Sequence, residues 1–150
     1  MRSKLFIILA VVTVLVGVGA QTASAAVPAA QLARFKAVEG PFSAADSKWA
    51  TALSNLSGNA TVAQVSKPSL AFIPALKAFD TGLKRVGFKG AGATDVATIV
   101  KLNGQLIGIL SSVRSVKSFE SQFSALDPKY FAVQQSFAKY LGIPTGDVII

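Results

Sequence analysis

The sequence has no cysteine and no histidine among its 150 residues. It therefore lacks the usual ligands of zinc and haem iron, and it lacks the serine–histidine and cysteine–histidine pairs that activate nucleophiles. No disulfide can stabilise the fold, and no lipid can be attached to a cysteine, which excludes a lipoprotein. We therefore predict a protein that is not an enzyme and that has no metal or cofactor.

Acidic side chains are also scarce, because only seven Asp and Glu residues accompany 15 Lys and Arg residues. They form no D-x-D-x-D-G calcium loop. A spacing of three predicts surface ion pairs of Lys36 with Glu39 and of Lys117 with Glu120. A hydrolase that uses two carboxylates distant in sequence remains the enzymatic alternative. The seven acids are Glu39, Asp46, Asp80, Asp95, Glu120, Asp127 and Asp147.

The first 25 residues have the layout of a secretory signal peptide. Arg2 and Lys4 give a positive start, an uncharged and mostly apolar run follows over residues 5–20, and Ala25 ends an A-x-A cleavage pattern. The run is 16 residues long by this count, whereas a spanning helix needs about 20. We predict cleavage after Ala25, or alternatively after Ala26, and no membrane span afterwards. A retained membrane anchor is the competing interpretation.

Cleavage would leave residues 26–150, about 125 residues, which is the size of one domain. Without Arg2 and Lys4, 13 of the 15 basic residues remain against seven acidic ones, a net charge of +6. These charges are spread along the chain rather than gathered in a stripe with aromatic residues, so we do not expect nucleic acid as a partner. Alanine-rich exported proteins without disulfides are typical of bacteria, and we expect a secreted or envelope protein whose partner is another protein or an anionic envelope polymer.

The first half of this domain has apolar residues at helical steps of three and four. One helix is predicted over residues 28–38, and Gly40 and Pro41 then interrupt it. A second is predicted over residues 42–56 with Ser43 as its cap. The two stretches form either separate helices or one helix kinked at proline. The next helix begins between residues 61 and 68 and runs to Val86, with Pro74 kinking it or delaying its start.

The second half shows the same periodicity. A long helix is predicted to begin with Thr94 or Asp95 as its cap, to carry Leu106 on its apolar face and to extend toward Phe123. The last helix is predicted to start with Asp127 as its cap and to end at Gly142. The apolar residues 148–150 are expected to dock on the domain. Together these segments predict an all-α fold, an antiparallel bundle of about four helices.

Residues 87–94, GFKGAGAT, resemble in spacing the phosphate-binding loop G-x-x-x-x-G-K-[ST]. That loop needs a preceding strand and a lysine, but the preceding segment has helical periodicity and Ala93 stands at the lysine position. We interpret the stretch as a turn in which Gly87 ends one helix while Gly90 and Gly92 reverse the chain. Non-specific anion binding at the start of the next helix is the alternative.

The candidate residues for that anion site are Lys84, Arg85, Lys89 and Thr94. Part of this charge is expected in a helix-surface pair, because Lys84 follows Asp80 by four residues.

Few other polar or aromatic positions are candidates for function. Asn103 is predicted to face solvent beside the apolar stripe; alternatively, it is buried and sets helix register or meets a ligand. Tyr130 and Tyr140 are expected to bury their rings and leave their hydroxyl groups at the rim. Trp49 is expected in the core.

Three functions are compatible with these features. The first is a non-enzymatic exported helical protein that acts through its surface as a binding or interaction module. The second is a carrier that holds an apolar ligand in the bundle core. The third is the hydrolase with scattered carboxylates. The carrier would line its pocket with Phe72, Phe79, Phe119, Phe123, Phe131 and Phe137.

Overall fold

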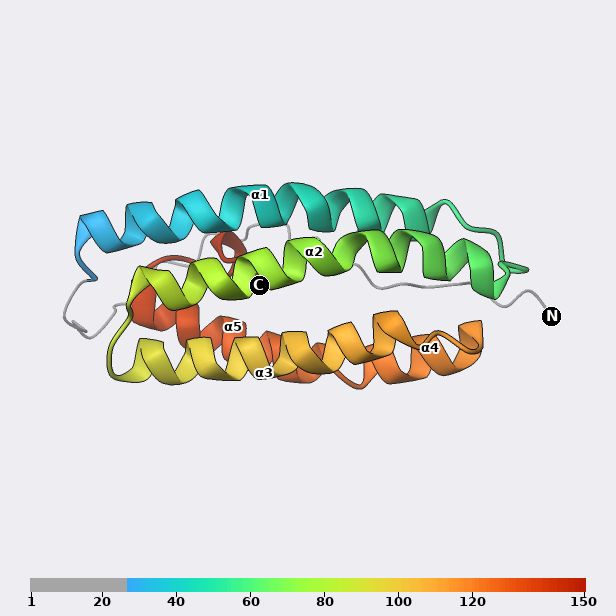
Figure 1. Cartoon of the computed structure of the whole chain (residues 1–150). Coiled ribbons are helices and arrows are strands. Elements are labelled where there is room, and N and C mark those ends of the chain that lie inside the picture. Colours follow the sequence, from blue (N-terminus) through green and yellow to red (C-terminus); the bar gives the residue numbers. More distant parts are fainter. Residues whose placement is uncertain (1–26) are drawn as a thin grey trace.

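The computed structural model describes residues 27–150, and the predicted signal peptide lies outside the described residues (Figure 1). Within residues 27–150 every regular element is a helix and no strand occurs, which confirms the all-α prediction. The elements are α1 (Ala29–Ser54), α2 (Val62–Val86), α3 (Ala91–Ser111), α4 (Val116–Ser124), α5 (Asp127–Leu141) and the 3₁₀ turn η1 (Thr145–Asp147).

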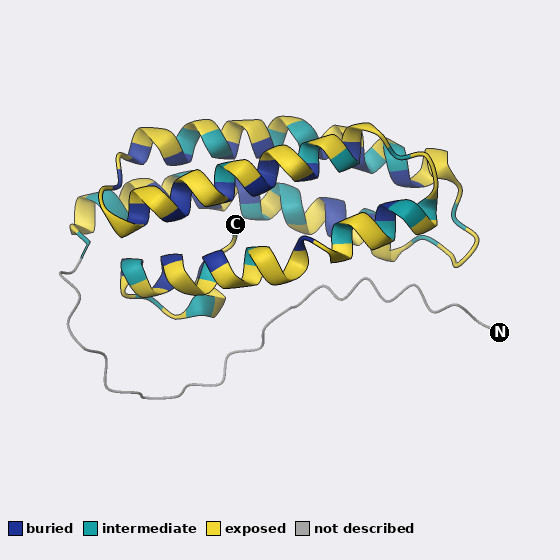
Figure 2. Ribbon diagram, turned by 90° about the horizontal axis from the view of Figure 1, so that it is seen from below, coloured by how far each residue is buried: buried dark blue, intermediate teal, exposed yellow. Residues whose placement is uncertain are grey.

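The long helices lie side by side as a helical bundle. α1 packs on α2, α2 on α3 and α3 on α5, while the short α4 lies against α3 and α5. Short connections reverse the chain between these helices, so consecutive long helices run in opposite directions. Figure 2 shows that buried residues form a stripe on the inner side of each helix, whereas the outer sides are exposed. This is the pattern expected when amphipathic helices cover one core.

Aromatic rings in α1 and α2 form one half of that core. Phe42 stacks on Phe79 with ring centroids 4.2 Å apart, and Trp49 stacks on Phe72 at 4.9 Å. All four side chains are buried. Trp49 also donates a hydrogen bond to the buried hydroxyl of Ser69 at 3.4 Å. The prediction of Trp49 as a core residue is therefore confirmed.

Of the two alternatives for residues 28–56, separate helices are wrong and a single helix is confirmed, because α1 continues through Gly40 and Pro41. A proline inside a helix costs about 3 kcal/mol or more. Here both residues lie on the exposed face, while Phe35 and Phe42 on either side of them are buried against the rest of the bundle. Burial of each such ring contributes about 1.5–3 kcal/mol, so packing outweighs the local preference. Ser43 lies inside the helix and is not a cap.

The start and end of α2 agree with the predicted range. Thr61 accepts a hydrogen bond from the backbone N–H of Gln64, and the Gln64 side chain accepts one from the N–H of Thr61. This reciprocal capping box satisfies two N–H groups at the helix start. Pro68 and Pro74 both lie inside α2, so Pro74 does not delay its start.

The predicted long third helix is wrong at both ends. It starts at Ala91 with Gly90 as the N-cap, so Thr94 and Asp95 lie inside the helix rather than capping it. It stops at Ser111, and a separate α4 follows. The hydroxyl of Ser112 donates to the Gly108 carbonyl at 2.7 Å, and side-chain bonds of this kind compete with helix continuation.

The α4 segment begins with its own cap. Ser115 accepts a hydrogen bond from the N–H of Ser118 at 3.1 Å. The predicted ion pair of Lys117 with Glu120 is wrong: among residues 27–150 no such pair forms, and one buried Glu120 oxygen lacks a hydrogen-bond partner.

The last helix agrees with the prediction apart from its cap. Leu126 is the N-cap of α5, and Asp127 is the first helical residue, so the assignment of Asp127 as a cap is wrong. Gly142 ends the helix with φ 71°, a left-handed conformation that glycine adopts without strain. The expected docking of residues 148–150 is confirmed in that Val148 is completely buried.

Candidate anion-binding pocket

The connection between α2 and α3 is the glycine turn predicted from GFKGAGAT. Gly87 ends α2 with φ 75°, and Gly90 has φ 56° immediately before α3. The segment before Gly87 is a helix, which supports the turn interpretation against a phosphate loop. Gly92 does not reverse the chain as predicted, because it lies inside α3. It is buried in α3, and a side chain there would collide with the ring of Tyr140.

Phe88 anchors this connection in the core. Its ring is only 8% exposed, and it meets the rings of Phe35, Phe137 and Tyr140 edge-on at centroid distances of 6.3, 5.1 and 5.8 Å. Edge-to-face contacts of this kind add to the stabilisation from burial. The packing of Phe88 on rings of α1 and α5 therefore positions the backbone of the neighbouring Lys89.

An open pocket of about 640 Å³ lies beside this turn. The first turns of α1, the end of α2 and Tyr140 of α5 form its walls. Gln31 links two of these walls, because its side-chain amide donates to the carbonyl oxygen of Gly87 at 3.0 Å and to that of Val86 at 3.5 Å. These bonds satisfy carbonyl groups that the end of a helix leaves free.

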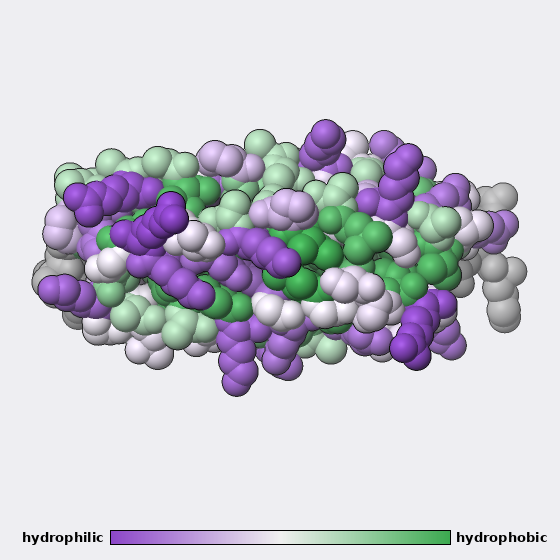
Figure 3. Space-filling view, viewed as in Figure 1, coloured by the Kyte–Doolittle hydropathy of each residue, from purple (hydrophilic) through white to green (hydrophobic). Residues whose placement is uncertain are grey.

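Three positively charged residues line the pocket, namely Arg34, Arg85 and Lys89. All three are exposed, and no carboxylate lines the pocket. Between residues 27 and 150 the ion pair of Lys36 with Glu39 is the only one, so none of the three cations has a carboxylate within ion-pair distance in this part of the chain. Figure 3 shows long hydrophilic side chains gathered over this end of the molecule. The pocket can thus attract an anion and form charge-assisted hydrogen bonds with it.

The structure brings together part of the predicted anion site. Arg85 and Lys89 line the pocket, whereas Lys84 and Thr94 do not. The Thr94 hydroxyl donates weakly to the Gly90 carbonyl at 3.4 Å, and its backbone N–H also bonds to Gly90, so this N–H is not free for an anion.

Sequence reasoning missed Arg34, Gln31 and Tyr140 as pocket residues. Arg34 precedes Arg85 by about 50 positions, and a local pattern carries no signal for such a meeting. Only the antiparallel packing of α1 on α2 brings the two arginines to the same end. The prediction that Tyr140 packs its ring in the bundle agrees with its place, since the ring packs on Phe88 while the residue also borders the pocket.

A second polar feature lies inside the bundle and links three helices. The side-chain amide of Asn103 donates to Asp80 at 2.6 Å, and the Tyr130 hydroxyl donates to the Asn103 carbonyl oxygen at 2.7 Å. Asn103 is completely buried, so the prediction that it faces solvent is wrong and the buried alternative holds. We call Asp80, Asn103 and Tyr130 the interior polar chain.

The acids around this chain are partly desolvated. Burial raises the pKa of Asp80, although its hydrogen bond from Asn103 and the charge of Lys84 act in the opposite direction. Burial also raises the pKa of Asp46. Burial and the negative charges of Asp80 and Asp46 raise the pKa of Tyr130, so this phenol stays protonated and donates its hydrogen bond.

Asp80 is committed to this chain rather than to the predicted surface pair with Lys84, which does not form within residues 27–150. Asp95 behaves similarly. It is buried and accepts a hydrogen bond from the Ser136 hydroxyl, which lies 3.0 Å from both carboxylate oxygens. Burial raises the pKa of Asp95, while the bond from Ser136 opposes the shift. Both acids therefore join α3 to a neighbouring helix.

The phenylalanines named for the carrier contact one another or neighbouring aromatic rings, with one exception. Phe119 and Phe123 stack with centroids 6.0 Å apart, and Trp49 covers Phe72. Phe131 is 51% exposed and therefore does not belong to the core.

No group of three or more metal-binding side chains occurs in the described residues. Compared with protein-family models, with curated proteins and with solved structures, the chain matches none.

Proposed function

We propose that the protein is exported by means of residues 1–25 and that its mature form is a non-enzymatic module that binds an anionic polymer of the cell envelope. The supporting observation is the convergence of Arg34, Arg85 and Lys89 on one pocket without carboxylate partners in the described chain. Two arginines suit phosphate or carboxylate groups, because each guanidinium offers a planar fork of donors. The pocket is open, so it can take one unit of a polymer that continues on either side.

Binding explains the observations better than catalysis does. The sequence lacks histidine and cysteine. The half-buried Asp80 and the buried Asp95 accept hydrogen bonds from Asn103 and Ser136. A catalytic carboxylate must instead reach a substrate. No observation favours the apolar carrier over a filled core, because the core phenylalanines meet other aromatic rings.

Export is supported by the layout of the first 25 residues. In the described part of the chain no helix combines the length and apolar character that a membrane crossing requires.

Removal of Arg85 or of Lys89, two of the three pocket cations, should weaken the binding of a polyphosphate probe. A charge-assisted hydrogen bond contributes about 1.5–3 kcal/mol, so we expect Arg85→Gln and Lys89→Gln each to raise the Kd about tenfold or more. Titration calorimetry at one fixed salt concentration measures this change, with inorganic phosphate as a second probe. Binding should also weaken as salt is added.

Lys84→Gln is the matched control, because Lys84 lies next to Arg85 but does not line the pocket. We expect it to change the Kd by less than about threefold, the effect of a solvent-exposed charge. Equal losses for Lys84→Gln and Arg85→Gln would mean that the probe senses only overall positive charge. The pocket would then have no special role.

The intact mass of the protein purified from its producer tests the export proposal. We expect a chain that begins at Ala26, or at Val27 if cleavage occurs one residue later. Native mass spectrometry on the same sample detects any bound ligand. A full-length chain in the membrane fraction would contradict cleavage and favour the anchor, and an apolar molecule lost on denaturation would favour the carrier.

A further inference from the structure

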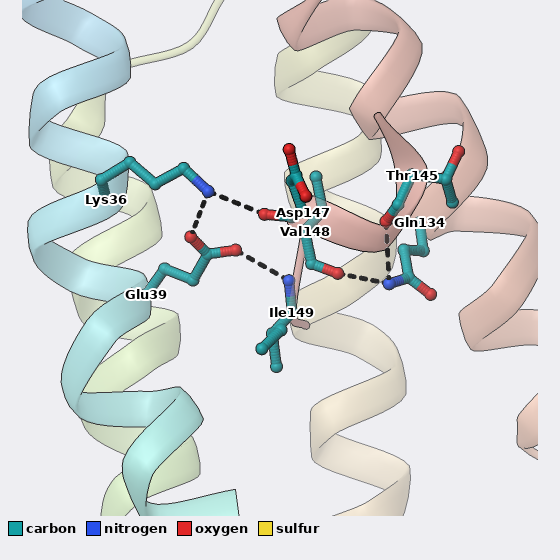
Figure 4. Close-up of polar contacts among 7 residues, drawn as sticks. All are labelled: Lys36, Glu39, Gln134, Thr145, Asp147, Val148 and Ile149. Carbon is teal, nitrogen blue, oxygen red and sulfur yellow. Dashed lines mark hydrogen bonds and ion pairs between the residues drawn. The ribbon is translucent and has the colours of Figure 1, made fainter. Parts of the chain in front are cut away.

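Residues after α5 fold back across the bundle and lie between α1 and α5. We call Thr145–Ile150 the closing segment. It starts with the 3₁₀ turn η1 and becomes extended at Val148, which has φ −110° and ψ 121°. Figure 4 shows this segment facing Lys36 and Glu39 of α1 on one side and Gln134 of α5 on the other. It therefore occupies a groove whose two walls come from distant parts of the chain.

Side chains of α1 hold the backbone of the closing segment. The Glu39 carboxylate accepts a hydrogen bond from the N–H of Ile149 at 2.7 Å (Figure 4). The Lys36 ammonium donates to the Asp147 carbonyl at 2.7 Å and to Glu39 at 2.8 Å. The predicted pair of Lys36 and Glu39 is thus confirmed, but it also binds peptide backbone. Glu39 is only 5% exposed with the segment in place, and its two partners there are Lys36 and the N–H of Ile149.

The other wall binds the same segment from α5. The Gln134 amide donates to the carbonyl oxygens of Thr145, at 3.3 Å, and of Val148. Val148 itself is completely buried, whereas Ile149 is 37% exposed. The groove thus recognises an extended peptide by its backbone groups and by one β-branched apolar side chain, which is how proteins bind extended segments in general.

The closing segment is also attached in a way that permits its release. The principal helix contacts run from α1 to α2, α3 and α5 in succession, and the segment bridges the remaining seam between α1 and α5. Only Gly142, Ile143 and Pro144 connect it to α5, and Gly142 has a backbone conformation that glycine changes at low cost. A few hydrogen bonds, the buried Val148 and the partly buried Ile150 hold it, so its local opening costs less than global unfolding.

We propose that this groove is a peptide-binding site and that its second occupant is the closing segment of another copy of this chain. The identical segment has the required backbone pattern and valine, so the contacts made within one chain can be repeated between two. Docking within one chain has a high effective concentration and keeps the protein monomeric when dilute. Two copies are joined when the segment released from one copy enters the vacated groove of the other.

Two variants separate the groove from the segment. Val148→Asp places a charge where the core is dry and releases the segment while leaving the groove intact. Glu39→Ala combined with Gln134→Ala removes three of the four side-chain hydrogen bonds to the backbone of the segment and leaves only that of Lys36 to Asp147, while the segment itself is unchanged. We expect each variant alone to be monomeric at about 0.1 mM, because each lacks one half of the pair.

Mixing the two variants should produce a one-to-one heterodimer, which native mass spectrometry identifies by the different masses of the chains. The control is a chain that carries Glu39→Ala, Gln134→Ala and Val148→Asp together. It should form no heterodimer with the Val148→Asp chain. Circular dichroism first establishes that each variant keeps its helix content. Folded variants that stay monomeric in the mixture would overturn the proposal.

A peptide of residues 143–150 provides the second measurement. It should bind the Val148→Asp chain, and the same peptide with aspartate at the valine position should bind at least about tenfold more weakly, given the cost of burying a charge. If the variants do not fold, a measurement on the wild-type chain tests the exchange of segments. Isotope-labelled and unlabelled wild-type protein, mixed at about millimolar concentration, should yield mixed dimers. Their absence would contradict segment exchange.

Discussion

Replacing Leu106 by aspartate should unfold the protein. Leu106 is 5% exposed in the middle of α3 and belongs to the single hydrophobic core. An unpaired charge buried there costs several kcal/mol, and a domain of this size has only about 5–15 kcal/mol of stability. We expect a loss of at least about 4 kcal/mol. Loss of the far-ultraviolet helical signal at 25 °C, or a large fall in the urea midpoint, measures it.

Leu70→Asp is the control for this prediction, because Leu70 is also a leucine in a long helix but is 52% exposed on α2. A substitution at an exposed position should change stability by about 0.5 kcal/mol or less. If Leu106→Asp leaves the urea midpoint as high as Leu70→Asp does, then α3 does not pack with Leu106 inside. The packing of α3 in the bundle would then be wrong.

Replacing Asn103 by leucine should have the second largest effect. Asn103 is completely buried and bonds to both Asp80 and Tyr130. Leucine would leave the Asp80 carboxylate and the Tyr130 hydroxyl without these partners. Each orphaned polar group costs about 1–3 kcal/mol, so we expect a loss of about 2–5 kcal/mol, measured by urea unfolding at neutral pH.

The remainder of the interior polar chain supplies the control. Asn103→Leu combined with Asp80→Leu and Tyr130→Phe removes all partners together, and replacing a whole network by apolar groups can be nearly neutral. We therefore expect the triple variant to recover most of the stability lost by Asn103→Leu alone. A triple variant as unstable as the sum of its separate changes would show that these residues act independently.

The helical fold was predictable because apolar residues recur at steps of three and four through most of residues 28–142. That periodicity also produced the main error, since Val113, Val116 and Phe123 continue the rhythm of α3 although the helix stops at Ser111. The chain turns where serine hydroxyls bond to backbone, and Ser115 then caps α4. The serines were a local signal for this break, but the apolar pattern concealed it.

Pro41 had the opposite effect, because it left open whether residues 28–56 form one helix or two. Local preference predicts a break there, and the structure has an unbroken α1. Burial of Phe35 and Phe42 against other helices offsets the cost of the proline. No local rule could include the free energy of this burial, because it depends on residues such as Phe79 and Phe137 far along the chain.

The basic character of the pocket was partly visible in the sequence. Arg85 and Lys89 are close enough along the chain to suggest an anion site beside the glycine turn. Arg34 joins them only because α1 and α2 are antiparallel and place the first turns of one beside the last turn of the other. The burial of Glu39 and its bond to Ile149 similarly join residues about 110 positions apart.

By itself, the sequence determined the helical class, the absence of thiol and imidazole chemistry, the glycine turn at residues 87–90 and the positive charge of the chain. These properties follow from composition and from interactions between residues a few positions apart. Only the tertiary structure decided that Asn103 is buried, that Arg34 meets Arg85 and that Val148 closes the seam between α1 and α5. The physical reason is that these contacts depend on which helix faces pack together, and that choice minimises exposed apolar surface over the whole chain.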